Sequence, residues 1–173
     1  MAVSLYDLSV ASYLQVLPAV EAFLKKGQEH FAANKADADA VADIRLAPDM
    51  LPFRFQVHSV VHHSQGAIAG IKAGLFTPPP PMPKTGYAGL VQQVADARAA
   101  LEKVTPDEVE ALSGRDMTFA MGEMKIPFTV ETFLLSFSLP NFYFHAATAY
   151  DILRAQGVPL GKRDFLGRMR IKR

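Results

Sequence analysis

Hydrophobic residues recur every three or four positions along four long stretches of the chain. In the first stretch one apolar face is formed by Leu5, Leu8, Val16, Ala19 and Phe23. This spacing is typical of amphipathic helices that bury one side. The pattern predicts helices over about residues 5–33, 49–73, 86–103 and 129–156.

Capping residues and helix breakers refine the first two helices. Ser4, with Asp7 three residues later, forms a variant of the capping box. Pro18 and Gly27 lie inside the first helix, and we expect a kink there because a proline removes a backbone hydrogen bond. Asp49 can cap the second helix, with Pro52 in its first turn and Gly74 after its last.

The later connections also carry local signals. Residues 75–85 include four consecutive prolines and predict an extended polyproline II strut. Thr105, a proline and Glu108 predict a short capped helical turn. The fourth helix is expected to be interrupted at Pro140 and to stop before Gly157.

Two β-type runs precede the fourth helix. Residues 117–121 and 124–128 are joined by Gly122-Glu123, which suits a tight hairpin turn. Pro127 restricts the second run to an edge, because proline cannot donate to a ladder on that side. We therefore expect a small flap and not a larger sheet.

These elements predict an all-α fold, a single four-helix-bundle domain over residues 1–173 with a small hairpin before the last helix. The connections over residues 34–48 and 75–85 are longer than the usual roughly 2–8 residues, so at least one crossover is expected. The last segment, residues 157–173, is a basic tail.

Composition excludes several classes of protein and site. The 173 residues contain no cysteine, which rules out disulfides, cysteine nucleophiles and thiolate metal sites. The formal net charge of +1 argues against a dedicated nucleic-acid partner. No apolar run is long enough to span a membrane and no targeting segment is visible, so a cytoplasmic location without membrane attachment is expected.

The candidate chemistry lies in histidines. His58 and His62 are four residues apart and share one helical face, whereas His63 should point about 100° away. On the fourth helix Asn141, His145 and Thr148 form a polar stripe among apolar and aromatic neighbours. Such a stripe either forms a buried hydrogen-bond network or lines a cavity. We expect a pocket that binds a small molecule near His58, His62, Asn141, His145 and Thr148.

A metal centre is the first alternative. Three neutral imidazoles from two helices, His58, His62 and His145, could hold Zn²⁺ or Ni²⁺ and leave one position open. A bound water or a thiol cofactor would then be the nucleophile of a divergent hydrolase or transferase. The glutamates that a di-iron bundle requires three residues before its histidines are absent.

A second alternative is an interaction protein that acts through its basic tail. Six cations and one carboxylate lie close together there: Lys162, Arg163, Asp164, Arg168, Arg170, Lys172 and Arg173. Such a cluster could contact phosphate groups with salt-dependent affinity. Because aromatic residues other than Phe165 are missing from it, a solvated terminus is favoured over nucleic-acid binding.

The C-terminal residues also resemble a known family. The segments 141–154 and 157–167, together with Asp49-Met50, Gln56-Val57 and Ser4-Leu5-Tyr6, are similar to signatures of the DUF1993 family, a domain of unknown function. The resemblance implies the DinB/YfiT-like four-helix bundle, often a homodimer, whose better-known members carry a metal on three histidines. His145 matches the first histidine of the expected pair on the last helix, but Ala149 stands where the second would be.

Overall fold

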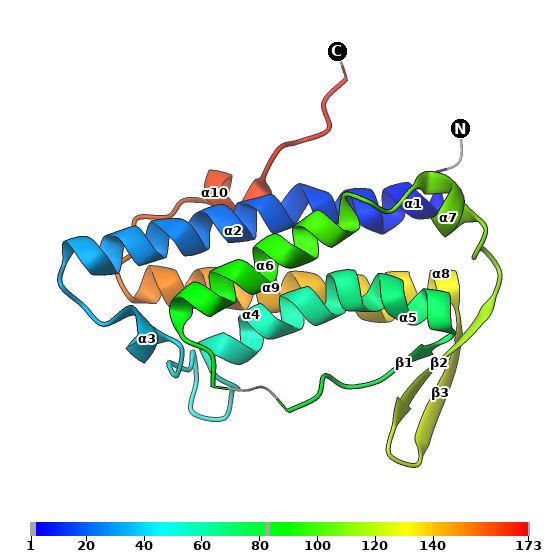
Figure 1. Ribbon diagram of the computed structural model, residues 1–173, viewed down its shortest axis with the longest axis horizontal. Helices are drawn as coiled ribbons and strands as arrows, with labels where there is room; N and C mark the ends of the chain where they lie inside the picture. The colour runs from blue at the N-terminus through cyan, green and yellow to red at the C-terminus, as the bar shows by residue number, and fades with distance from the viewer. Residues whose placement is uncertain (1–2, 82–83, 173) are drawn as a thin grey trace.

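The computed structural model describes residues 3–81 and 84–172, and most of them are helical (Figure 1). The helices are α1 (Leu5–Leu8), α2 (Val10–Ala33), α3 (Ala38–Val41), α4 (Phe53–Val61), α5 (Ala67–Ala73), α6 (Tyr87–Leu101), α7 (Pro106–Glu110), α8 (Val130–Phe133), α9 (Leu139–Ala155) and α10 (Lys162–Leu166). Two π-helical segments, η1 (His62–Gly66) and η2 (Leu134–Ser138), join α4 to α5 and α8 to α9.

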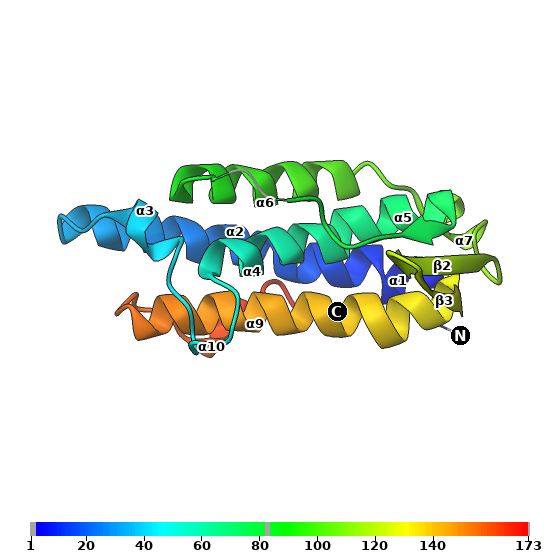
Figure 2. The same ribbon diagram turned by 90° about the horizontal axis from the view of Figure 1, so that it is seen from below.

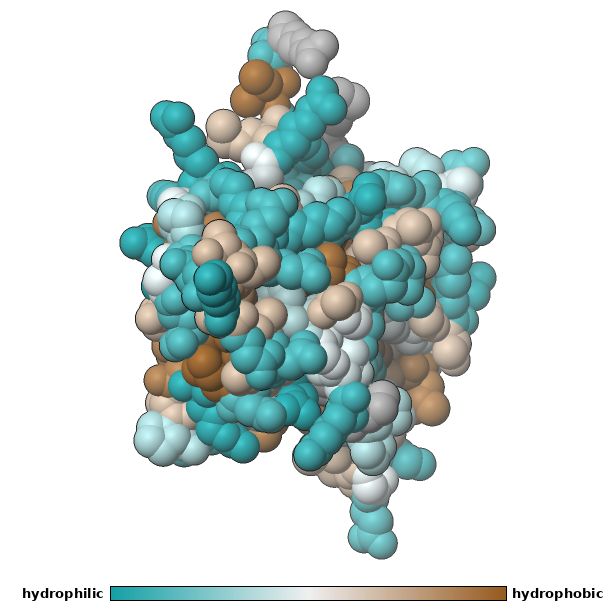
Figure 3. All heavy atoms as spheres, turned by 60° about the vertical axis from the view of Figure 1, so that its left-hand side comes forward, coloured by the Kyte–Doolittle hydropathy of each residue, from teal (hydrophilic) through white to brown (hydrophobic). Residues whose placement is uncertain are grey.

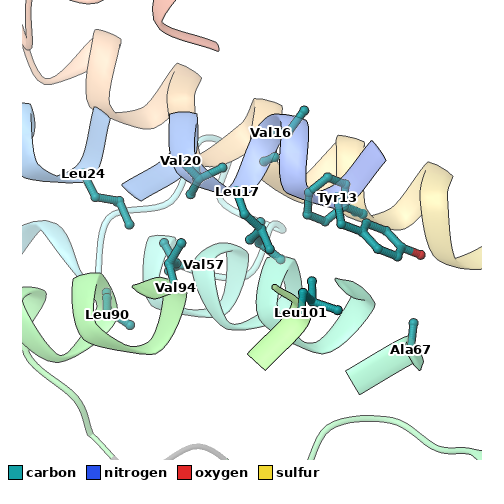
Figure 4. Close-up of a cluster of buried hydrophobic side chains, with 14 of the residues drawn as sticks. Tyr13, Val16, Leu17, Val20, Leu24, Val57, Ala67, Leu90, Val94 and Leu101 are labelled. Carbon is teal, nitrogen blue, oxygen red and sulfur yellow. The ribbon is translucent and has the colours of Figure 1, made fainter. Parts of the chain in front are cut away.

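The long helical segments lie side by side along the molecule (Figures 1 and 2). Helix α2 packs against α6 and α9, and α4 packs against the same two helices. Their apolar faces meet in a core that excludes water, and burial of this apolar surface is the main force that holds the helices together. Figure 4 shows part of this core, with side chains of α2 facing those of α4, α5 and α6.

A three-stranded sheet covers one end of the helices. Strand β1 (Leu75–Phe76) pairs in parallel with β2 (Asp116–Met121), and β2 pairs antiparallel with β3 (Met124–Thr129). The hairpin and the edge position of β3 are confirmed, whereas the expectation of an isolated flap is wrong because β1 extends it into a sheet. Gly122 has a φ of 59°, as the tight turn requires.

The first predicted helix differs in where it breaks. The chain bends at Ser9, whose hydroxyl bonds the carbonyl of Leu5 (2.7 Å), and α2 then continues through Pro18 and Gly27. Pro18 and Gly27 therefore do not interrupt the helix, and the break lies before them, at Ser9. Gly27 leaves space for the Tyr87 side chain, because a Cβ atom there would lie 2.2 Å from the hydroxyl oxygen of Tyr87.

The second and fourth predicted helices contain the π-helical segments. Helix α4 begins at Phe53 after Pro52, later than the predicted cap at Asp49, and Gly74 ends α5 with a φ of 71° as expected. On the fourth helix the irregularity comes before Pro140, which occupies the first turn of α9. Gly157 ends that helix with a φ of 85°.

The remaining predicted segments have mixed outcomes. The capping box of Thr105 and Glu108 is present at the start of α7. Of the polyproline strut, residues 75–76 form β1, residues 77–81 have no regular secondary structure, and residues 82–83 lie outside the described residues. The tail forms α10, which packs against α2.

Membrane-spanning helices are absent from the part of the chain that the structure describes. Within residues 3–81 and 84–172, no helix is both long and apolar enough to cross a membrane. Figure 3 shows one face of the molecule, on which hydrophilic side chains surround small hydrophobic areas.

Candidate functional site

The two π-helical segments are joined through buried hydrogen bonds. A π turn has a wider hydrogen-bond spacing than an α-helix and commonly occurs at functional sites. The Ser138 hydroxyl at the end of η2 donates to the His63 carbonyl in η1 (2.7 Å), and the buried Tyr13 hydroxyl lies 2.8 Å from the Ser138 oxygen. Because the His63 carbonyl only accepts, Ser138 donates to it and Tyr13 donates to Ser138. This series of hydrogen bonds ties His63 to the end of η2, which leads into the last long helix.

A pocket of about 190 Å³ lies beside these segments. It has an apolar part and a polar part. Its apolar lining residues are Phe55, Phe76, Pro78, Pro79, Phe119 and Phe137, and its polar ones are Ser59, His62, His63, Asn141 and His145. None of the described residues that line it is Asp, Glu, Lys or Arg, so a charged molecule that entered it would lose hydration without an ion pair in return.

Hydrogen bonds orient the imidazole of His145. The side-chain NH₂ group of Gln56 donates to the Leu51 carbonyl (2.7 Å). The side-chain oxygen of Gln56 therefore faces Nδ1 of His145, at 2.7 Å. An amide oxygen only accepts, so the network assigns the proton to Nδ1 of His145. Its Nε2 is then an acceptor on a ring that lines the pocket. The amide of Asn141 donates to the Phe137 carbonyl (2.7 Å), which likewise leaves its oxygen as an acceptor.

The other two histidines meet His145 in the pocket wall. The rings of His63 and His145 are stacked, with centroids 5.9 Å apart and an interplanar angle of 15°. Nδ1 of His63 is buried and has no hydrogen-bond partner in the described part of the chain. Nε2 of His62 donates to the Thr77 carbonyl (2.8 Å), which ties the segment after β1 to the pocket.

Burial keeps these imidazoles neutral. It lowers the pKa of His63 to about 3, and the neighbouring imidazoles of His62 and His145 lower it further. Burial also lowers the pKa of His145 to about 4. The pKa of His62 is lowered by burial too, although its bond to Thr77 opposes the shift. At neutral pH the wall therefore presents uncharged rings that can each donate one hydrogen bond and accept one.

The structure brings together three of the five residues predicted for the site. His62, Asn141 and His145 line one pocket. His58 is not among the lining residues, and its two ring nitrogens are buried without a partner in the described residues. Thr148 is buried, with its hydroxyl bonded to the Phe144 carbonyl (2.8 Å), and lies outside the lining as well.

Two residues of the site were missed from the sequence. His63 was assigned to another face because a regular α-helix separates neighbours by about 100°. The π turn that begins at His62 changes this phase, so His62 and His63 both reach the pocket. Gln56 was noted only within the family resemblance and not as a site residue. The available clue was the unbroken polar run His62-His63-Ser64-Gln65 in the second predicted helix.

The structure does not assemble the three predicted metal ligands into one group. The described residues include no group of three or more His, Cys, Asp or Glu side chains placed to hold one. His58 lies outside the pocket, and the ring nitrogen of His62 that bonds Thr77 is occupied.

Metal content tests this assessment. We expect untagged protein purified without chelators to contain well under one equivalent of Zn²⁺ or Ni²⁺, as measured by plasma mass spectrometry. Near-stoichiometric metal that is lost in both His62→Ala and His145→Ala would contradict it and would require the rings to rearrange.

Comparisons with known proteins agree with this architecture. The profile of a family described as a domain of unknown function, DUF1993, matches residues 5–166. A crystal structure of a DinB family member protein from Shewanella denitrificans is similar, with 27% sequence identity, a TM-score of 0.79, and coverage of 98% of this chain and 95% of that one. No curated protein matches the chain.

Proposed function

The chain belongs to the DUF1993 family of domains of unknown function, and we propose that it binds a small uncharged molecule in the histidine pocket. The observation that carries the proposal is the orientation of His145. Gln56 holds its Nδ1 proton, so that Nε2 is available to accept a hydrogen bond from a ligand. The ring is half-buried and its Nδ1 is already bonded to Gln56, so Nε2 is the ring atom left to bond a ligand.

The lining defines the chemistry of the ligand. Aromatic and proline side chains form most of the wall and favour a flat apolar body. The acceptors on His145 and Asn141 favour a hydroxyl or N–H group on that body. The volume of about 190 Å³ is below the roughly 300–1,000 Å³ of pockets for drug-sized ligands, so the ligand is small. We therefore propose a single aromatic or heteroaromatic ring with a hydrogen-bond donor.

Phenol and toluene test this proposal, because they have nearly the same shape and only phenol donates a hydrogen bond. We expect phenol to shift amide resonances around the pocket in a ¹H–¹⁵N NMR titration and to bind more tightly than toluene. His145→Phe keeps an aromatic ring but removes the acceptor, so its affinity for phenol should fall about tenfold, the loss of one hydrogen bond. Its affinity for toluene should change less than about twofold.

His30 provides a matched control, since it lies near the end of α2 and outside the lining. His30→Phe should bind phenol as the unchanged protein does. Equal affinity for phenol and toluene would remove the role of His145, and no binding of either at millimolar concentration would reject the small-molecule function.

We also propose that the long helical segments form the DinB-like four-helix bundle in one domain over residues 1–173. The similarity to the DinB family member supports this arrangement. The homodimer and the cytoplasmic location remain predictions. Light scattering coupled to size exclusion would measure the oligomeric state.

A further inference from the structure

A second pocket of about 340 Å³ lies between α9 and α10, apart from the histidine pocket. It combines aromatic rings, two cations and one carboxylate. Its lining residues are Ala147, Tyr150, Asp151, Arg154, Lys162 and Phe165. The volume is within the range of small-molecule sites.

Helix α10 forms one wall of this pocket and is held firmly on α2. Lys26 of α2 forms an ion pair with Asp164 of α10. The side-chain amide of Gln15 donates to the Leu166 carbonyl (3.2 Å). At Gly167 the chain comes so close to α2 that a Cβ atom would lie 2.1 Å from the Gln15 carbonyl oxygen. These contacts fix the position of α10 on α2, so the residues that α10 contributes to the pocket have a defined position.

Two aromatic rings line this pocket. Phe165 packs edge-on against Tyr150, with ring centroids 5.8 Å apart, and Tyr150 packs edge-on against the buried Phe23 at 5.9 Å. Each of these contacts has the T-shaped geometry that aromatic pairs prefer. These contacts hold the Tyr150 and Phe165 rings in place, and both rings are part of the lining that a planar molecule would meet.

The rim carries an excess of positive charge. The guanidinium carbon of Arg154 lies 6.0 Å from the centroid of the Tyr150 ring, and its nitrogen lies 3.5 Å from the Tyr150 hydroxyl. Within residues 3–81 and 84–172, neither Arg154 nor Lys162 forms an ion pair with a carboxylate, although Asp151 lines the same pocket. By contrast, the nearby Lys26 is paired. Two unpaired cations against one carboxylate leave the pocket suited to an anion.

We propose that this second pocket binds a planar ring that carries one carboxylate or phosphate group. The ring lies on Tyr150 and Phe165, and the anionic group is held by Arg154 and Lys162. Asp151 disfavours a ligand with more than one anionic group, because the second group would lie near the Asp151 carboxylate. The two pockets thus differ in chemistry: no described residue that lines the histidine pocket is charged, and this one requires a charge on its ligand.

The test is a ¹H–¹⁵N NMR titration with benzoate, phenyl phosphate, benzamide and inorganic phosphate. We expect benzoate or phenyl phosphate to shift resonances of α9 and α10, and their relative affinities show which anion the pocket prefers. Lys162→Gln should weaken binding of the preferred anion about fivefold, as expected for one exposed ion pair. Lys162→Arg should restore it, and Lys103→Gln, which removes an exposed cation at the end of α6, should leave it unchanged.

Four outcomes would overturn the proposal. Binding of benzamide as tight as that of benzoate would show that the cations play no role. Equal competition by inorganic phosphate would show that the rings play no role. Shifts confined to the histidine pocket would reassign the ligand, and no shift at millimolar concentration would reject the site. The phenol titration of the histidine pocket is unaffected by any of these results, so the two proposals fail separately.

Discussion

Lowering the pH from 7 to 5 is expected to reduce the free energy of unfolding by about 3 kcal/mol through His63 and His145. Both imidazoles are neutral in the folded protein, with pKa values of about 3 and about 4. In the unfolded chain they take up a proton near the ordinary pKa of about 6.5. Between these values the unfolded state binds more protons than the folded state, so stability rises with pH and is lost as the pH falls below about 6.5.

The two histidines contribute unequally. His63 is 8% exposed. Below the unfolded-state pKa of about 6.5, each pH unit lowers the free energy of unfolding by about 1.4 kcal/mol, which gives about 2 kcal/mol at pH 5. His145 is only half-buried, and water screens its charge, so we assign it about 1 kcal/mol. The carboxylates whose pKa the fold lowers, such as Glu21 and Glu131, stay largely ionised in both states above pH 5, so they contribute little in this window.

Urea denaturation at pH 5, 6 and 7 measures this effect. His63→Gln should lose most of the pH dependence, and His145→Gln should lose a smaller part. If His63→Gln keeps the full loss of stability between pH 7 and 5, the neutral, buried state of His63 is wrong.

The helices were predictable because their signals are local. The apolar stripe of α2, the capping box of Thr105 and Glu108 and the glycine after α5 each act within a few residues. Local hydrogen bonds and side-chain spacing determine such features, so one sequence shows them. The break at Ser9 was missed because Pro18 is the stronger local signal, although α2 accommodates it.

The parts that were missed depend on distant contacts. Strand β1 is two residues long and exists through its pairing with β2, about forty residues later in the chain. The π turn at His62 changes the phase of the helix, and the His63 carbonyl within it accepts a hydrogen bond from Ser138, 75 residues later in the chain. Asn141 and His145 followed from their polar stripe, whereas His63 depends on contacts that a single sequence does not show.

That bond leads to the second large effect, a loss of about 3 kcal/mol of stability in Ser138→Ala. Ser138 and Tyr13 are both fully buried. Removing the Ser138 hydroxyl leaves the Tyr13 hydroxyl and the His63 carbonyl without the partner that satisfies them (2.8 and 2.7 Å). A buried polar group without a partner costs about 1–3 kcal/mol, and two are created at once.

Ser136→Ala is the matched control, because Ser136 lies in the same π-helical segment and is exposed, with its hydroxyl bonded to the Thr132 carbonyl. Its free energy of unfolding should stay within about 0.5 kcal/mol of the unchanged protein, as is usual for surface substitutions. A double-mutant cycle with Tyr13→Phe completes the argument. Once the Tyr13 hydroxyl is absent, Ser138→Ala should cost less, because only the His63 carbonyl loses its partner. Equal costs in both backgrounds would mean that the three groups do not act as one chain, and that His63 is held in the pocket by packing alone.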